Sequence, residues 1–285
     1  MTQKGHRLDT IRHAYFTALL VCLSLFTITA CQSLNSRQSQ QERKQAEILD
    51  AKKAVIVSYL NKGLPQMALK DLRESIAAHP QDADLKNLMG LAQLAVQNPN
   101  KSIGYFKDAY KLDPKVPVAL NLSSAYIEAG EQNKAIELLI KLQNGKESQS
   151  YPHPERISHN LGLAHERLGK VKQAEKYYVL ALKDNSSFYL SLMRLGQLYD
   201  KSGRPKQARI QYQRAKETCD VCFDPVEALS KNFINIKRAD LAVSTLKRYM
   251  NTKDVTTTDK TRAQKLLSTA EKVANLQMRS RTTVR

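Results

Sequence analysis

The fold of this protein is decided by residues 155–222, which read ERISHNLGLAHERLGKVKQAEKYYVLALKDNSSFYLSLMRLGQLYDKSGRPKQARIQYQRAKETCDVC. Residues of the same type recur within this stretch at a constant offset. Gly162 recurs as Gly196 and Tyr178 as Tyr212, and both differences, 196 minus 162 and 212 minus 178, are 34. Three further pairs keep this offset, namely Gly169 and Gly203, Ala174 and Ala208, and Ala181 and Ala215. A period of this length predicts a repeat architecture.

Small and aromatic residues in each repeat indicate two antiparallel helices that pack closely, over about 154–168 and 172–183 in the first copy. Gly162 and Ala174 allow the helices to approach, Tyr178 fills the space behind them, and Gly169 lies in the turn, where a residue without Cβ tolerates positive φ. The spacing of these residues, together with Leu161 and Ala181, resembles the tetratricopeptide repeat. One such pair cannot bury its own apolar face, so neighbouring pairs must stack on it.

The same pattern extends along the chain in both directions. It predicts repeats at 49–82, 83–115 and 116–145, and a weaker one at 223–254, where Lys237 replaces the turn glycine. The polar segment 146–154 is either a loop or a shift in superhelical register. Residues 261–277 have the spacing of an amphipathic capping helix, and residues 279–285 are expected to be a disordered basic tail. We therefore predict an all-α tetratricopeptide-repeat superhelical solenoid of about six helix-turn-helix repeats with a C-terminal capping helix.

The N-terminus has the layout of an export signal. A basic region ending at Arg12 leads into an uncharged apolar run over 14–30, for which a membrane-spanning anchor is the alternative interpretation. The run ends in Ile28-Thr29-Ala30-Cys31, which resembles a bacterial lipobox with Cys31 as the acylated residue. Gln32 resembles the residue that sorts lipoproteins to the outer membrane. We expect a periplasm-facing lipoprotein of a Gram-negative bacterium, anchored in outer-membrane lipid by its acyl chains.

These signals divide the chain into four parts. They are a signal peptide at 1–30, a lipidated N-terminus and flexible tether at 31–47, repeats at 48–254, and a capping helix with a basic tail at 255–285. The last residues of the tether are alternatively the first turn of the following helix.

Charge restricts the class of partner. The chain of 285 residues carries a formal net charge of +18, which favours acidic proteins, anionic lipid headgroups, polyanionic cell-wall material or nucleic acid. The export signal argues against nucleic acid. The expected partners are therefore envelope proteins and membrane lipid, with the protein itself a monomer.

The cysteines left after processing form one close pair, Cys219 and Cys222. In an oxidising compartment a structural disulfide is the favoured interpretation, and a free or metal-binding pair and a redox-active dithiol are the alternatives. No second cysteine pair is present for zinc, and His159 and His165 fall on different faces of one predicted helix. We expect no catalytic residues, no metal and no cofactor, and hence no enzyme.

The partner-binding surface is expected on the first helices of the repeats, where mixed amide, charged and apolar side chains suit an extended peptide or a helix. The template places the groove at Asn87, Leu91, Leu94, Leu120, Asn121, Ser124, Arg156, His159, Asn160, Leu163, Met193, Arg194 and Gln197. On this hypothesis, Asn160→Ala leaves folding intact but weakens binding, whereas Ala174→Leu overpacks the helix pair. The alternative is that these positions are only a solvated or internally packed surface.

The whole arrangement resembles a known family. The lipobox, the tether, the repeats and a Tyr-Pro-x-Pro-Glu-Arg segment at 151–156 that leads into Asn160-Leu-Gly-Leu-Ala are similar to the pilotin lipoproteins of type IV pili, the PilW, PilF or Tgl family. This resemblance implies that the protein helps the pilus secretin to reach the outer membrane and to multimerise. A general periplasmic scaffold that recruits cell-wall or envelope-assembly proteins is the alternative.

Overall fold

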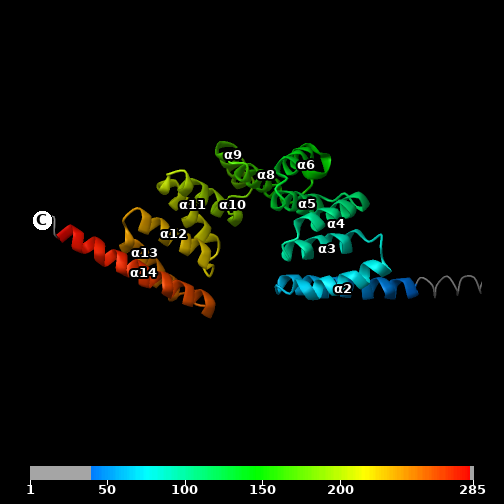
Figure 1. The fold of residues 1–285 in the computed structure, drawn as a ribbon, viewed down its shortest axis with the longest axis horizontal. Coiled ribbons are helices and arrows are strands. Elements are labelled where there is room, and N and C mark those ends of the chain that lie inside the picture. Colours follow the sequence, from blue (N-terminus) through cyan, green and yellow to red (C-terminus); the bar gives the residue numbers. More distant parts are fainter. Residues whose placement is uncertain (1–39, 283–285) are drawn as a thin grey trace, which may run out of the picture. The chain divides into compact units, whose positions relative to one another are not determined.

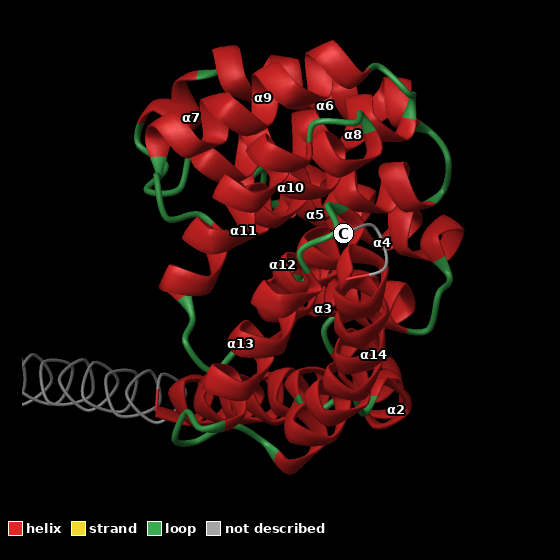
Figure 2. Cartoon of the chain, turned by 90° about the vertical axis from the view of Figure 1, so that its left-hand side faces the viewer, coloured by secondary structure: helices red, strands yellow, loops and turns green. Residues whose placement is uncertain are grey.

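A computed structural model describes residues 40–282, and every regular element within them is a helix (Figure 2). The chain divides after Pro80 into two compact units, which are described separately. The predicted signal peptide and Cys31 lie outside the described residues. Within residues 40–282, no helix is both long and apolar enough to span a membrane.

The first unit contains one helical pair. Residues 40–61 are helical, and after a turn at Gly63 the chain enters α2 (Pro65–Ala78), where proline stands in the first turn and costs no helical hydrogen bond. Ile56 and Leu72 are fully buried. The predicted first repeat is therefore present. Residues 40–47 belong to its first helix, so the predicted flexible tether is wrong for them and the alternative interpretation holds.

The second unit consists of helices that follow one another as packed pairs (Figure 1). Its elements are α3 (Ala83–Ala95), α4 (Pro99–Leu112), α5 (Val116–Glu128), α6 (Gln132–Asn144), α7 (Lys146–Gln149), α8 (Glu155–Arg167), α9 (Val171–Asp184), α10 (Tyr189–Lys201), α11 (Pro205–Thr218), α12 (Phe223–Asn235), α13 (Ala239–Met250) and α14 (Thr257–Thr282). The fold is the predicted tetratricopeptide-repeat solenoid with a C-terminal helix.

The two helices of a pair approach closely because a very small residue faces a large one. A Cβ atom added to Gly162 would lie 2.6 Å from the ring of Tyr178, and one added to Gly196 would lie 2.4 Å from the ring of Tyr212. At these distances a side chain at either glycine clashes with the ring. In α5 the matching residue is buried Ser123, and its partner position in α6 holds the smaller Leu139. Side-chain volumes on the two helices therefore compensate each other.

The turn between paired helices places one residue in the left-handed region of φ. Gly130, Gly169 and Gly203 have φ of +82°, +70° and +70°, which glycine adopts without a steric penalty. Gln97 and Lys237 take the same position in two other pairs with φ of 58° and 60°. Lys237, the residue that weakens the sequence pattern of the sixth repeat, therefore keeps the turn geometry.

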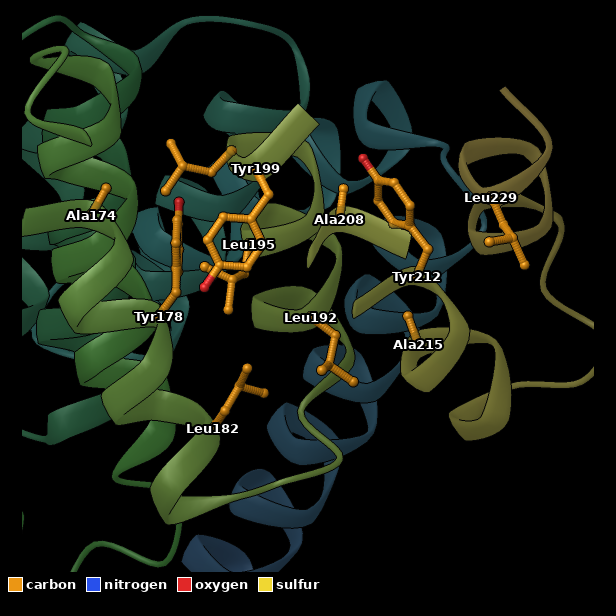
Figure 3. Packing of buried hydrophobic residues seen from close by; sticks show 11 residues of the cluster. Ala174, Tyr178, Leu182, Leu192, Leu195, Tyr199, Ala208, Tyr212, Ala215 and Leu229 are labelled. Carbon is orange, nitrogen blue, oxygen red and sulfur yellow. The ribbon is translucent and has the colours of Figure 1, made fainter. Parts of the chain in front are cut away.

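In the second unit, the clusters of buried residues draw side chains from more than one helical pair. Around α10, buried side chains from α9, α11 and α12 meet, with Tyr178 and Tyr212 fully or almost fully enclosed (Figure 3). Such burial gives each aromatic about 2 to 3 kcal/mol relative to exposure. Because successive pairs share side chains in this way, each pair depends on its neighbours for stability.

Two segments differ from a regular repeat. Residues 146–154 form the short helix α7 and a loop, and beyond them Ile157 and Leu161 of α8 still join the cluster that contains Leu139 of α6. This insertion leaves the stacking intact. The capping helix is longer than predicted because α14 spans Thr257–Thr282, so the start of the expected disordered tail is helical.

Candidate partner-binding groove

The second unit has a cavity of about 710 Å³ between the first helices of its last three repeats. Its walls come from α8, α10 and α12, with one side chain from α11. The lining residues are His159, Tyr189, Leu190, Met193, Arg194, Gln197, Asp200, Tyr212, Asp224, Glu227, Ala228, Lys231 and Asn235. We call this cavity the groove.

Helical spacing explains why these residues share one surface. On α10 the lining residues are separated by one, three or four positions from Tyr189 to Asp200, and α12 shows the same spacing from Asp224 to Asn235. Residues three and four apart lie on one face of a helix. The opposite faces carry the buried residues, such as Leu195 and Leu229, that join the core. The groove is therefore the face of these helices that core packing leaves uncovered.

His159 lines the groove and joins α8 to α10. Its Nδ1 atom lies 3.0 Å from Oγ of Ser191, and its ring packs edge-on against Phe188. Burial, with a smaller contribution from the charges of Arg194 and Arg156, lowers the pKa of His159 to about 4. The imidazole is neutral at physiological pH and serves as a hydrogen-bonding link between the two repeats.

Asp200 is held by groups at the inner edge of the groove. Its carboxylate accepts hydrogen bonds from the Tyr212 hydroxyl at 3.0 Å and from Nδ2 of Asn232 at 2.7 Å. Burial and then the neighbouring Asp200 charge raise the pKa of Tyr212, so the phenol stays protonated. Asn232 also donates to the carbonyl of Pro205, at 3.0 Å. This network joins α10, α11 and α12.

The acidic side chains on the α12 wall are paired as well. Arg262 of the capping helix donates to Asp224 at 3.1 Å and to Glu227 at 2.8 Å, and Lys231 lies 2.7 Å from Glu227. Burial alone would raise the pKa of Glu227, but Lys231 and Arg262 together lower it below its ordinary value. Asp224 and Glu227 of the α12 wall thus both have cationic partners within the protein.

Four of the sequence-predicted groove residues meet in this cavity: His159, Met193, Arg194 and Gln197. Arg156 is exposed on α8 and does not line it. Leu91, Leu94 and Leu163 are partly buried and pack against the core cluster of α4, α5 and α6. Leu120 is buried, with 6% of its surface exposed. The structure therefore brings together in this cavity one predicted residue from the fourth repeat and three from the fifth.

The predicted asparagines form contacts between successive repeats. Nδ2 of Asn121 donates to Oδ1 of Asn87 at 2.9 Å. Nδ2 of Asn160 lies 3.0 Å from Oγ of Ser123, with Oγ of Ser124 and the carbonyl oxygen of Leu120 each at 3.3 Å. These amides link α3 to α5 and α5 to α8. The expectation that Asn160→Ala leaves folding intact is therefore revised, because the substitution removes hydrogen bonds within the solenoid.

The α12 wall was not predicted, although the sequence contained a signal for it. The 34-residue offset that relates the repeats takes Met193 to Glu227 and Gln197 to Lys231, since 193 plus 34 is 227 and 197 plus 34 is 231. Extending the template into the sixth repeat would therefore have found this wall. Tyr189 and Leu190 lie one turn before Met193 and are found by the same helical spacing.

The cysteine pair lies at the entrance to α12. Cys219 and Cys222 are bonded through their sulfur atoms, with Cα atoms 5.4 Å apart. Between them, the carbonyl of Val221 accepts a hydrogen bond from the Tyr249 hydroxyl at 2.8 Å. This short loop connects α11 to α12, and the hydrogen bond from Tyr249 attaches the loop to α13. In residues 40–282 no three histidine, cysteine or acidic side chains gather as metal ligands would.

Together these helices define a protein with the tetratricopeptide-repeat fold. Residues 57–117 and 159–220 match the sequence profile of the tetratricopeptide repeat family. Three solved structures illustrate the likeness. PilF of Pseudomonas aeruginosa is 20% identical with a TM-score of 0.57, covering 71% of this chain and 90% of that chain.

PilW, a widely conserved type IV pilus biogenesis factor, is 14% identical with a TM-score of 0.60, covering 75% of this chain and 97% of that chain. Yeast Tom70 is 13% identical with a TM-score of 0.61, covering 79% of this chain and 47% of that chain. The scores for PilW and Tom70 are almost equal. At these identities the likeness concerns the fold alone.

Proposed function

We propose that this protein is an outer-membrane lipoprotein that acts as a pilotin in type IV pilus biogenesis. Its groove binds a segment of the secretin and so promotes the localisation of the secretin in the outer membrane and its assembly into multimers. Support comes from the lipobox at Cys31 and from the structural likeness to PilF and PilW, whose chains are covered to 90% and 97%.

The observation that carries the binding role is the groove itself. A volume of about 710 Å³ is within the range in which protein pockets hold ligands. Its apolar side chains, among them the half-exposed Leu190, stand beside polar groups such as Gln197. This combination suits a peptide segment, because apolar contacts supply affinity and polar groups determine orientation.

Deletion of the gene tests the pilotin role. We expect the secretin to remain monomeric and surface pili to be lost, with multimers measured in outer-membrane fractions on denaturing gels. The wild-type gene should restore multimers, whereas Met193→Glu, which places a charge in the groove, should not. Ile210→Glu on α11 is a matched control, because Ile210 is 54% exposed and lies outside the groove. Intact secretin multimers in the deletion strain would refute this function.

The anchor needs a separate test, because Cys31 lies outside the described residues. We expect mass spectrometry of the mature protein to find an acylated Cys31 as the first residue. Cys31→Ser should release the protein from the membrane fraction. A mature chain that still begins at Met1 would contradict the lipoprotein assignment.

A general envelope scaffold is the second candidate function, and the charge of the chain favours it. A net charge of +18 suits anionic envelope polymers and the acidic surfaces of proteins that act on them. Co-purification from crosslinked envelopes distinguishes the two functions. Recovery of the secretin supports the pilotin role, and recovery of cell-wall enzymes without the secretin supports the scaffold.

A further inference from the structure

A second cavity of the same unit lies between the second helices of the fourth and fifth repeats. Its volume is about 310 Å³, and it shares no lining residue with the groove. The lining comes from α9, α10 and α11 and consists of Val179, Leu182, Lys183, Leu195, Tyr199, Gln211 and Arg214. Leu182, Leu195 and Tyr199 are buried members of the core cluster in Figure 3, whereas Val179 and Lys183 are exposed. We call this cavity the α9–α11 cleft.

Lysines extend this surface along the exposed face of α9. Lys172, Lys176, Val179 and Lys183 are separated by four, three and four positions, which is the spacing of residues on one face of a helix. All four side chains are exposed. None of the three lysines forms an ion pair with a residue that the structure describes. We call Lys172, Lys176 and Lys183 the lysine stripe.

The acidic residues of α9 and α11 are too few to neutralise this surface. The two helices contain seven lysines and arginines but only three acids, so their net charge is 7 minus 3, or +4. One of the acids, Glu175, is already paired, because both of its carboxylate oxygens accept hydrogen bonds from Arg204, at 3.1 and 2.8 Å. The positive charge of the lysine stripe is therefore available to a ligand.

The guanidinium in the cleft has only neutral partners among the described residues. Arg214 donates to Oε1 of Gln211 at 3.3 Å and to the carbonyl oxygen of Ser186 at 2.8 Å. These bonds fix its orientation and leave its charge unmatched. Arg214 and Lys183 thus place two cationic groups beside the apolar side chains of Val179 and Leu182.

This arrangement fits an anionic phospholipid. Phosphate oxygens accept charge-assisted hydrogen bonds from guanidinium and ammonium groups. The hydrocarbon attached to the headgroup gains from contact with apolar side chains such as Val179 and Leu182. A lipid combines both features in one molecule, with the phosphate next to the first methylene groups.

The type of cation favours a membrane over an acidic protein as the ligand. Protein–protein interfaces are depleted of lysine, whereas polybasic segments bind anionic membrane surfaces through lysine and arginine alike. A lysine side chain places its hydrated charge at the end of a flexible stem, which suits mobile lipid headgroups. An aliphatic residue between lysines, such as Val179, is also typical of a helix that lies at a membrane interface.

We propose that the lysine stripe and the α9–α11 cleft form a docking surface for anionic phospholipid. Lys183 and Arg214 bind the lipid phosphate, Val179 contacts the adjoining methylene groups, and the rest of the stripe lies along neighbouring headgroups. This surface acts in addition to any anchor at the N-terminus and does not depend on the pilotin role. It leaves the groove free, because no groove residue belongs to it.

Tryptophan fluorescence tests this contact in the full-length protein reconstituted into lipid vesicles. The chain contains no tryptophan, so a single introduced one reports only on its own surroundings. Val179→Trp places it on the docking surface. Leu190→Trp is the matched control, because Leu190 is 49% exposed and Val179 is 48% exposed, but Leu190 lines the groove.

The vesicles contain brominated phosphatidylcholine as a quencher, either alone or mixed with phosphatidylglycerol. We expect the emission of Val179→Trp to shift to the blue and to be quenched when phosphatidylglycerol is present. Both effects should weaken at high salt, because salt screens the attraction between lysines and headgroups. Leu190→Trp should give the same spectrum in both kinds of vesicle.

Charge variants in the Val179→Trp background identify the residues responsible. Lys176→Gln combined with Lys183→Gln should lower the ratio of docked to undocked protein by about 25-fold, roughly five-fold for each lysine. Lys265→Gln combined with Lys272→Gln is the matched control, which removes the same charge from exposed positions on α14. This control should leave the quenching unchanged. Thermal unfolding should be the same for both pairs, since all four lysines are exposed.

Several outcomes would overturn the proposal. These are equal quenching of Val179→Trp and Leu190→Trp, quenching that does not require phosphatidylglycerol, or quenching that persists when Lys176 and Lys183 are both glutamine. A blue shift with soluble polyglutamate, but no quenching in phosphatidylglycerol vesicles, would assign the surface to an acidic protein instead.

Discussion

The first helices of the second unit use the same surface in two different ways. From α3 to α8, the polar groups of this surface bond to one another, as Asn121 does to Asn87 and Asn160 does to Ser123. From α8 to α12, the surface opens into a cavity of about 710 Å³, where Arg194 has no partner among the described residues. We call these the closed and the open segments. The same position can thus link repeats in some copies and stand without such a link in another.

The largest expected effect concerns His159, where the two segments meet. Its folded-state pKa is about 4, against an ordinary value of 6.5, so the unfolded chain binds a proton more readily in this range. The stability that His159 contributes is complete above pH 6.5 and is lost as pH falls through 4. The loss should reach about 3 kcal/mol, since each pKa unit is worth about 1.4 kcal/mol.

Denaturant unfolding followed between pH 7 and 4 measures this loss. His159→Gln keeps a polar side chain without a titrating group and should flatten that part of the profile. His153→Gln is the control, because His153 is exposed and precedes α8 in the chain. A profile that His159→Gln leaves unchanged would show that the histidine does not hold the segments together.

The second prediction compares one glycine from each segment. Gly162→Ala and Gly196→Ala each bring a Cβ atom within 2.6 Å or less of a tyrosine ring, so each should destabilise the protein by about 1 to 3 kcal/mol. Gly196→Ala displaces α10, which supplies more of the groove lining than α8 does, so it should weaken the binding of a secretin peptide more than Gly162→Ala. Gly104→Ala is the control, because nothing lies within 4 Å of its added Cβ and alanine favours the helix.

Thermal unfolding and fluorescence anisotropy of the labelled peptide with the same three variants check both parts of this prediction. Equal losses of affinity for Gly162→Ala and Gly196→Ala would mean that the closed segment takes part in binding, and the distinction between the two segments would then fail.

The two segments show which features could be predicted from the sequence and which could not. The helix pairs could be predicted from the 34-residue period, because Gly162, Ala174 and Tyr178 indicate how closely two helices must pack. The hydrogen bonds of Asn160 did not follow, since its partners Ser123 and Ser124 are far away in sequence and meet it only through stacking. Periodicity identifies the face on which a residue lies but does not reveal whether a neighbouring repeat already uses its polar atoms.

The third prediction compares one substitution in the closed segment with one in the open segment. Asn160→Ala removes hydrogen bonds to α5 and should lower the free energy of unfolding by about 1 to 2 kcal/mol, with little effect on peptide affinity. Arg194→Ala removes no such bond, so stability should change by less than about 0.5 kcal/mol while affinity falls. Urea unfolding of both variants beside peptide titrations measures this contrast. The reverse pattern would assign recognition to the closed segment.

The smallest effect concerns the turn of the sixth repeat, which supports the far wall of the groove. Lys237 holds φ at 60°, a conformation that costs a residue with Cβ about 1 kcal/mol relative to glycine. Lys237→Gly should therefore raise stability by about 0.5 to 1 kcal/mol, since glycine gains in the folded turn more than it loses through its freer unfolded chain. Gly203→Lys is the matched reverse change, at φ of +70° in the fifth repeat, and should destabilise by a similar amount.

Each of these turns follows a helix that lines the groove, α10 or α12. The two variants therefore also test whether partner binding depends on the stability of the open segment. If α12 must be firmly placed for binding, Lys237→Gly should raise peptide affinity slightly and Gly203→Lys should lower it. If affinity stays constant while both melting temperatures shift, the groove is already fully formed in the native state. In that case, the free guanidinium of Arg194, rather than the mobility of the last repeats, distinguishes the open segment from the closed one.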